Sequence, residues 1–387
     1  MKLLFASDSF KGSLTSEKTV ELLTKAAREI FGDCQTAGVP VADGGEGTVD
    51  AVIAAERGEK ISVQVHGPLH GEKISAVYGV LPGKRAVIEM AAASGLPLVP
   101  ENLRNPLHTT TYGTGEVILD ALEKGYRDIS IAIGGSATND GGMGCAKALG
   151  VRFLDSQGQE LDGYGRDLIR VANIDISGLD ARLKESKITV MCDVTNPLCG
   201  EHGATYTFGA QKGATPEIQK ELESGMINYR DIIKREFDMD CDQVEGAGAA
   251  GGLGAALKVF LSGEMKSGIE TVLELIHFDD RLNGVDLVVT GEGRTDWQSC
   301  FGKVMRGVGV HAKAKHIPAV GLSGSLGRGA LDITGHGVES LMTTVNAPMS
   351  LRDALDNAEL LYYEGAVRMF RFIRTGMTIA EKRAAKG

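Results

Sequence analysis

Several glycine-rich loops carry carboxylate, cationic and hydroxyl side chains directly after short apolar segments, which are candidate β-strands. In open α/β sheets, ligands bind at the carboxyl ends of the strands, so loops of this kind are candidate parts of one site. For any single loop an ordinary polar turn is the better explanation, and only the five loops together favour a site. They occupy residues 8–11, 43–47, 134–142, 193–196 and 291–296.

The loop at residues 134–142, GGSATNDGG, is the strongest candidate for binding phosphate. Its backbone amides can form an anion-binding nest, and glycine permits close approach of the backbone to a ligand. Ser136, Thr138 and Asn139 add polar side chains, whereas Asp140 would reach a phosphate only through a metal or water. We therefore predict that the nucleotide is bound by Gly134, Gly135, Ser136, Thr138, Asn139, Asp140, Gly141 and Lys303.

Other nucleotide and hydrolase motifs fit poorly. Gly302-Lys303 is followed by Val304, where a P-loop requires Ser or Thr. Residues 246–251 match the GxGxxG spacing by letter, but no buried strand precedes them. We therefore favour a closely packed helix over a nicotinamide site at these residues. The alternative that stays open is a contact between this backbone and a nucleotide. The sequence contains neither HExxH nor GxSxG, which disfavours His-based metal chemistry and a serine nucleophile.

Phosphoryl transfer needs positive charge at the migrating group, a divalent cation held by carboxylates, and a group that orients or deprotonates the acceptor hydroxyl. The cations Lys11, Arg294 and Lys303 lie in or just after the glycine-rich loops. For any one of these residues a structural salt bridge is an equally good interpretation, but the set favours anion recognition. The loop carboxylates are Asp8, Asp43, Glu46, Asp193, Glu292 and Asp296.

The overall composition indicates a small ligand. The 387 residues include 52 Gly and carry a formal net charge of −10, which argues against nucleic-acid and anionic-membrane partners. Six Cys without a CxxC pair predict reduced thiols. We find no signal-peptide core and no 18-residue apolar stretch, so we expect a cytoplasmic protein.

The elements that must position these loops alternate between strand and helix. A strand at residues 3–6, a helix at 15–31, a strand at 38–42 and a helix from residue 48 predict a parallel sheet. Residues 61–90 instead alternate apolar and polar side chains, which is typical of antiparallel hairpins.

The doubly wound pattern returns from residue 286, where strands and helices alternate again and a closing helix is expected at 351–372. Both chain ends are thus expected to form one α/β domain around an inserted central one, with the active site in the cleft between them. We predict one domain from residues 1–75 plus 284–387, and a mixed α/β domain from residues 76–283.

At this point the loops resemble, in order and spacing, the signatures of the type-1 glycerate kinase family. The matching blocks, from residue 8 to residue 303, are DSFKGSL, PVADGGEGT, YGTGE, AIGGSATNDGG, CDVTNPLCG, GAGAAGGLG and GEGRTDWQSCFGK. Ser7, Trp297 and Met305 depart from the residues usual in the family, which affects expected loop shape and access more than activity.

The resemblance implies ATP-dependent phosphorylation of D-glycerate, at the 2-hydroxyl for bacterial members of this size. It also implies two α/β domains, of which the one formed by both chain ends is flavodoxin-like or Rossmann-like. The alternatives are the same chemistry giving 3-phosphoglycerate, another small hydroxy acid as acceptor, or an inactive nucleotide-binding regulatory protein. We expect ATP and Mg²⁺ as cofactors, glycerate as substrate, and a monomer or homodimer.

Residue roles are assigned here by chemistry. We predict that Asp193, or else Asp43, orients or deprotonates the glycerate hydroxyl, and that Lys11 and Arg294 bind the substrate carboxylate or the moving phosphoryl group. Asp296 and Glu46 are the predicted Mg²⁺ ligands. The predicted substrate-binding residues are Ser9, Lys11, Gly44, Gly45, Glu46, Arg294, Gln298 and Ser299.

Overall fold

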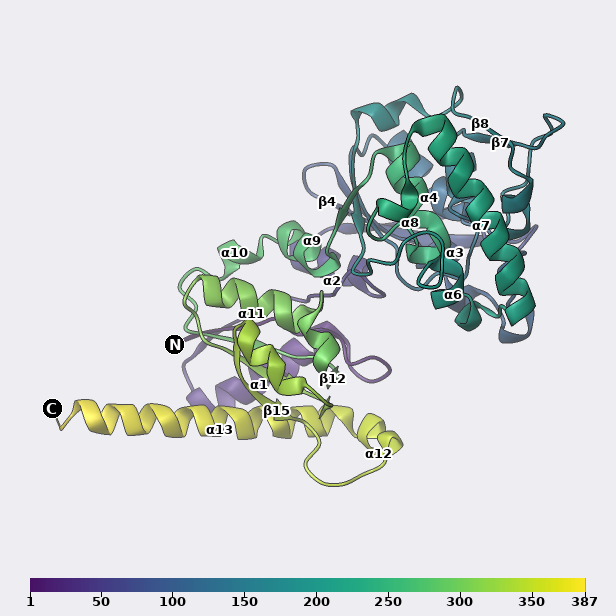
Figure 1. Ribbon diagram of the computed structural model, residues 1–387. Helices are drawn as coiled ribbons and strands as arrows, with labels where there is room; N and C mark the ends of the chain where they lie inside the picture. The colour runs from purple at the N-terminus through teal and green to yellow at the C-terminus, as the bar shows by residue number, and fades with distance from the viewer. Residues whose placement is uncertain (387) are drawn as a thin grey trace. The chain divides into compact units, whose positions relative to one another are not determined.

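The computed structural model describes residues 1–386, which divide into two compact units. Unit 1 contains residues 1–43, 50–55 and 269 onward, and unit 2 contains residues 44–49 and 56–268. Figure 1 shows the purple N-terminal segment and the green-to-yellow C-terminal segment together in unit 1. The cleft expected between the domains stays a prediction.

Unit 1 is built on a parallel sheet of five strands in the order β15-β13-β11-β1-β2. When these strands are numbered by their order along the chain, the arrangement is 2-1-3-4-5, which is the order of flavodoxin-like folds. This confirms the predicted parallel sheet formed by both chain ends. The strands are β1 (Lys2–Phe5), β2 (Gln35–Gly38), β11 (Leu287–Thr290), β13 (Ala319–Ser323) and β15 (Val338–Thr343).

The second strand begins earlier than the sequence pattern predicted. It covers residues 35–38 instead of 38–42, because Gln35 to Gly38 pair in register with Lys2 to Phe5. Val39 still donates its amide to the Phe5 carbonyl oxygen at 2.8 Å, and the chain then leaves the sheet. Residues 39–42 thus form the approach to the loop at 43–47.

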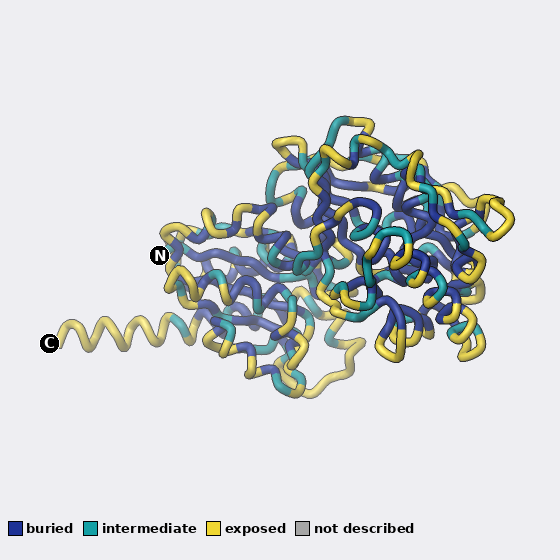
Figure 2. The backbone as a smooth tube through the Cα atoms, turned by 45° about the horizontal axis from the view of Figure 1, so that its top comes forward, coloured by how far each residue is buried: buried dark blue, intermediate teal, exposed yellow. Residues whose placement is uncertain are grey.

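The helices of unit 1 cover this sheet with apolar faces. The Thr15 hydroxyl caps α1 by accepting a hydrogen bond from the Lys18 amide, and α1 packs against α13 through Leu23, Ala27 and Phe370. The closing helix expected at 351–372 is two helices that meet at Asn357, and the second is longer than predicted. Its last turns are exposed (Figure 2). The unit 1 helices are α1 (Ser16–Phe31), α9 (Gly268–Leu275), α10 (Phe278–Arg281), α11 (Val304–Ala314), α12 (Leu351–Asp356) and α13 (Ala358–Ala384).

Unit 2 is built on a mixed sheet of six strands in the order β10-β9-β6-β5-β4-β3. Strands β3, β4 and β5 are antiparallel, as the alternation at residues 61–90 predicted, and β5, β6, β9 and β10 run parallel. The predicted domain segment 1–75 therefore includes β3, which pairs in this second sheet. The strands are β3 (Glu59–His66), β4 (Lys73–Leu81), β5 (Arg85–Glu89), β6 (Asp128–Ala132), β9 (Lys187–Met191) and β10 (Glu264–Lys266).

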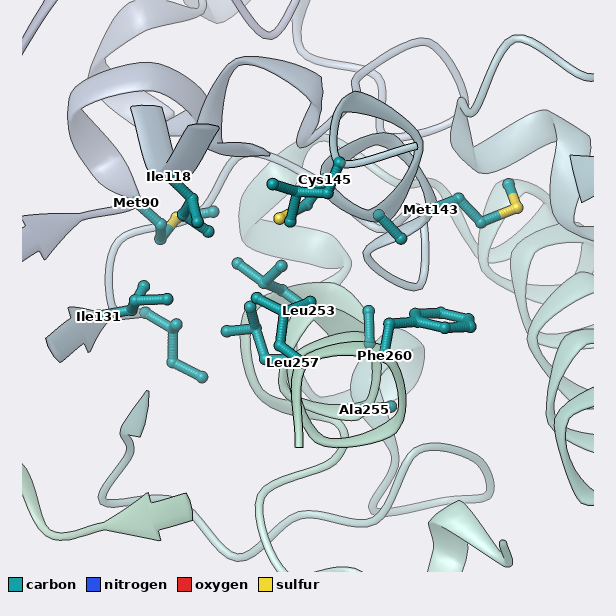
Figure 3. Close-up of a cluster of buried hydrophobic side chains, with 14 of the residues drawn as sticks. Met90, Ile118, Ile131, Met143, Cys145, Leu253, Ala255, Leu257 and Phe260 are labelled. Atoms are coloured by element: carbon teal, nitrogen blue, oxygen red, sulfur yellow. The ribbon is translucent and has the colours of Figure 1, made fainter. Parts of the chain in front are cut away.

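Helix α8 lies at the centre of the unit 2 core. Figure 3 shows Leu253, Leu257 and Phe260 of α8 among buried side chains that include Cys145 and Ile118. The helices of unit 2 are α3 (Ala91–Ser94), α4 (Tyr112–Glu123), α5 (Met143–Ala148), α6 (Ala204–Phe208), α7 (Pro216–Phe237) and α8 (Ala249–Leu261), and a hairpin pairs β7 (Arg152–Leu154) with β8 (Asn173–Asp175). Helix α2 (Thr48–Glu56) lies where the chain passes from one unit to the other. No helix among the described residues is long and apolar enough to span a membrane.

Candidate active site

Unit 1 contains a pocket of about 500 Å³ lined by the loops that follow its parallel strands. Asp8 follows β1 and Glu292 follows β11, and these two strands are neighbours at the point where the strand order reverses. Such a switch point is the usual ligand crevice of an open α/β sheet. The charged residues lining the pocket are Asp8, Lys11, Asp43, Glu292, Arg294 and Lys303.

Asp8 has the most perturbed carboxyl group of this pocket. Burial raises its pKa to about 7, and the nearby Asp43 and Glu292 carboxylates act in the same direction. A 2.7 Å hydrogen bond from the Ser9 amide and the charge of Lys11 oppose the shift. A carboxylate with a pKa near 7 can accept a proton at neutral pH and release it again, which is the property required of a general base.

Glu292 and the cations form the rest of the charged part of the pocket. Burial raises the pKa of Glu292, which accepts a 3.0 Å hydrogen bond from the Thr295 hydroxyl and lies 3.9 Å from Lys303 Nζ. Lys11 is exposed, and the Arg294 side chain is 68% exposed while its Nε lies 3.4 Å from Asp296 Oδ2. Two of the three cations are therefore accessible to an anionic ligand from solvent.

Asp296 has a structural role that the sequence did not reveal. Its Oδ1 accepts a 3.0 Å hydrogen bond from the Gln298 amide, and the Ser299 hydroxyl accepts one from the Asp296 amide. Together they cap the 3₁₀ helix η7 (Trp297–Cys300). Within the described chain, neither Asp296 nor Gln298 nor Ser299 lines the pocket, so their proposed ligand contacts stay predictions.

A second set of predicted residues lies at the carboxyl ends of β6 and β9 in unit 2. Asp193 follows β9, is exposed, and accepts a 3.1 Å hydrogen bond from the Gly268 amide. A Cβ atom on Gly134 would lie 3.6 Å from the Gly45 Cα, and one on Gly44 would lie 2.7 Å from the Gly268 Cα. The structure thus gathers Asp193 and these glycines at one edge of the sheet, and it leaves the neighbouring Glu46 exposed.

The inner half of the loop at residues 134–142 is buried. Asp140 accepts hydrogen bonds from the amide and hydroxyl of Thr111, at 2.7 and 2.8 Å, and from the amides of Gly142 and Gly144. Burial raises the Asp140 pKa, and these hydrogen bonds oppose that shift. Asn139 donates to Thr205. These side chains hold the loop in place, whereas only Gly134 and Gly135 of the loop are exposed.

The segment at residues 246–251, which matches the GxGxxG spacing, and the adjoining Gly252 pack directly against this loop. Gly251 has a φ of +67°, and a Cβ atom there would lie 2.0 Å from the Thr138 carbonyl oxygen. A Cβ on Gly252 would lie 2.7 Å from the Gly141 Cα. Glycine is needed at both positions so that the backbone of α8 can touch the loop, which confirms the interpretation as close helix packing.

The described residues contain no group of three or more His, Cys, Asp or Glu side chains that could hold a metal ion. In phosphoryl-transfer sites Mg²⁺ is usually held by one or two carboxylates together with the substrate phosphates. Asp296 and Glu46, the two carboxylates predicted as Mg²⁺ ligands, match that number, and their role stays a prediction.

Two charged residues of the pocket were missing from the predicted site. Asp8 and Glu292 were noted as loop carboxylates, but neither was given a role. The signal that could have found them is their place, since each lies within three residues of the end of a buried strand, and these strands are adjacent in the sheet.

Comparison with known proteins gives concordant matches across the chain. A family model described as the glycerate kinase family matches residues 3–374. The glycerate 2-kinase of Escherichia coli K12 is 47% identical over 385 residues, covering 99% of this chain and all of the relative. The glycerate kinase of Bacillus subtilis 168 is 45% identical over 359 residues, covering 92% of this chain and 94% of the relative. A crystal structure of a protein assigned as glycerate kinase 2 from Salmonella typhimurium LT2 superimposes with a TM-score of 0.88 at 44% identity. The match covers 98% of this chain and 99% of the solved chain.

Proposed function

The chain belongs to the glycerate kinase family, and from this membership we infer that it is an enzyme that phosphorylates D-glycerate with ATP. The relative from Escherichia coli is matched over its full length, and it is named as a 2-kinase. The reaction we propose is therefore transfer of the γ-phosphoryl group to the 2-hydroxyl, giving 2-phospho-D-glycerate and ADP. The single observation that carries the chemistry is Asp8, a carboxylate with a pKa of about 7 in a pocket that also holds exposed cations.

In this proposal the acceptor hydroxyl gives its proton to a loop carboxylate as its oxygen attacks the γ-phosphorus. Asp8 joins Asp43 and Asp193 as a candidate for this base, and its pKa of about 7 suits proton transfer at neutral pH. The Asp43 carboxylate lies close enough to raise the Asp8 pKa, which makes the ionised Asp8 a stronger proton acceptor.

Lys11 and Arg294 supply positive charge in the same pocket. We propose that they bind the glycerate carboxylate or the transferring phosphoryl group, for which the planar guanidinium offers two parallel donors. The exposed backbone of Gly134 and Gly135 is proposed to bind phosphate oxygens. When bound, Mg²⁺ would neutralise charge on the phosphates, and Asp296 and Glu46 remain its proposed ligands.

The test is phosphorus NMR of the product formed from ATP, Mg²⁺ and D-glycerate. A 2-phosphoglycerate signal that requires the protein is the expected result, and a 3-phosphoglycerate signal would move the acceptor to the other hydroxyl. Coupled ADP release across other small hydroxy acids tests the acceptor class. ATP binding without glycerate-dependent ADP would instead favour an inactive nucleotide-binding regulatory protein.

We further propose a cytoplasmic protein that acts on small molecules as a monomer or homodimer. The net charge of −10 supports the absence of nucleic-acid and anionic-membrane partners.

A further inference from the structure

The unit 1 pocket has an apolar part that the phosphoryl-transfer chemistry does not use. Besides the charged loops, it is lined by Phe10, Leu14, Val345, Leu351 and Leu355. The loop after β1 supplies the first two residues, and the loop after β15 and helix α12 supply the others. Phe10 is buried and packs edge to face against the buried ring of Tyr362, with 5.1 Å between the ring centroids, so this part of the wall is held by the core.

Helix α12 leaves two leucine side chains in contact with water at this pocket. Leu351 is 75% exposed and Leu355 is 39% exposed, although both line the pocket. Removal of apolar surface from water by a bound ligand lowers the free energy of the complex. A ligand that reached the charged loops and also covered these leucines would therefore bind more tightly than one that reached the charged loops alone.

The size of the pocket also exceeds what glycerate needs. Its volume of about 500 Å³ lies within the range typical of sites for much larger ligands, about 300–1,000 Å³. Glycerate has three carbons and four oxygens and would fill only a small part of it. A ligand with a flat aromatic ring system at one end and several negative charges at the other would fit both parts of the pocket.

We propose that the apolar part of this pocket, formed by Phe10, Leu14, Val345, Leu351 and Leu355, binds the adenine base of ATP. This assignment rests on the proposed function, because it takes ATP as the phosphoryl donor. The base lies against the leucines of α12, and the phosphates extend toward Lys11, Arg294 and Lys303, which line the same pocket. Helix α12 thereby becomes a determinant of nucleotide affinity.

The experiment measures the affinity of the full-length protein for ATP and for inorganic triphosphate by titration calorimetry. Leu355→Gln should weaken ATP binding by about tenfold or more, which corresponds to about 1.4 kcal/mol, and leave triphosphate binding unchanged. Leu360→Gln is the matched control, because Leu360 is 57% exposed on the neighbouring α13 and is not among the residues that line the pocket. Leu351→Gln is a second variant, since a side chain that is 75% exposed can be changed without disturbing the core.

Equal losses for ATP and triphosphate would overturn the base site, as would unchanged ATP affinity in both pocket variants or an effect of Leu360→Gln as large as theirs. Failure of the proposed function looks different. A wild-type protein that binds ATP but forms no glycerate-dependent ADP would refute the kinase activity, while the calorimetric comparison would still decide the base site.

Discussion

The Nζ atom of Lys212 donates a 2.7 Å hydrogen bond to the backbone carbonyl oxygen of Thr138, in the middle of the glycine-rich loop at residues 134–142. The lysine is 2% exposed. Burial lowers its pKa to about 7, and the nearby Asp140 opposes this shift. A buried amine therefore supports the loop from inside unit 2.

This pKa predicts how stability depends on pH. Between about pH 7 and 10.5 the unfolded chain holds a proton on Lys212 that the folded chain has released, so this group makes the free energy of unfolding rise with pH. One proton contributes up to about 1.4 kcal/mol per pH unit. Urea unfolding at several pH values should show a shallower rise for Lys212→Met than for the wild type.

The exposed Lys220, on α7, provides the control for this measurement. Lys220→Met should follow the wild-type slope, because its amine is exposed in the folded chain as in the unfolded one. An unchanged slope for Lys212→Met would show that the buried amine does not release its proton in this range.

The Asp8 carboxyl group should determine the acid limb of the activity profile. If Asp8 is the base, kcat/KM with glycerate rises with pH through an apparent pKa near 7, because only the ionised form accepts a proton. Asp8→Asn should lower turnover by about 10²- to 10⁴-fold while the protein still binds ATP. Steady-state kinetics from pH 5.5 to 9 test this, with the exposed Asp33→Asn as the control.

The same substitution should stabilise the fold at alkaline pH. A carboxyl pKa raised to about 7 means that stability is lost as pH rises from about 4 to 7, since the folded chain holds the proton longer than the unfolded one. Asp8→Asn removes this loss, so its free energy of unfolding at pH 8 should exceed that of the wild type. A variant that is both inactive and less stable would indicate a structural role for Asp8.

Asp193 is the competing base and can be tested without harming the fold. If Asp193 is the base, Asp193→Asn should lose most turnover. In either case it should keep its melting temperature, because the residue is exposed and an Asn oxygen can still accept the hydrogen bond from the Gly268 amide. Turnover assays and thermal unfolding are run beside the exposed Asp162→Asn. Near wild-type turnover in Asp193→Asn would remove this residue as the base.

The sequence predicted the parts of the fold that depend on local pattern. The helix at residues 15–31 and the hairpins at 61–90 were recognised because apolar residues repeat with the period of one element, and the structure confirms both. The predicted position of the second strand was wrong because the position of a strand is fixed by its partner, and the register of β2 is set by β1. Pairing between distant segments leaves no trace in local periodicity.

The candidate site was predicted in type but only partly in detail. The sequence indicated which loops carry charge, and the structure places Lys11, Asp43, Arg294 and Lys303 around one pocket. The sequence could not distinguish a side chain that binds a ligand from one that forms hydrogen bonds with the backbone. Asp140 is buried and accepts hydrogen bonds from the surrounding loops, a role that depends on residues up to 29 positions away.

His311 connects three helices of unit 1 through its two ring nitrogens. Nε2 lies 3.0 Å from Glu270 Oε2 on α9, and Nδ1 lies 2.8 Å from Asp279 Oδ1 on α10. Both carboxylates accept a hydrogen bond only if the ring carries two protons. The hydrogen bond with Glu270, followed by that with Asp279, raises the His311 pKa to about 9.

This arrangement predicts a pH-dependent loss of stability in His311→Gln. Because the folded-state pKa is raised above the unfolded value of 6.5, the stabilisation is fully present below pH 6.5 and is lost as pH rises through about 9. The variant should be about 1–2 kcal/mol less stable than the wild type near pH 6, a range that allows for screening of the partly exposed carboxylates. Urea unfolding should show this difference shrinking towards pH 10, whereas His336→Gln, which changes a histidine elsewhere in unit 1, should show no such trend. A difference for His311→Gln that is the same at pH 6 and pH 10 would mean that the ring stabilises the helices by packing and not by its charge.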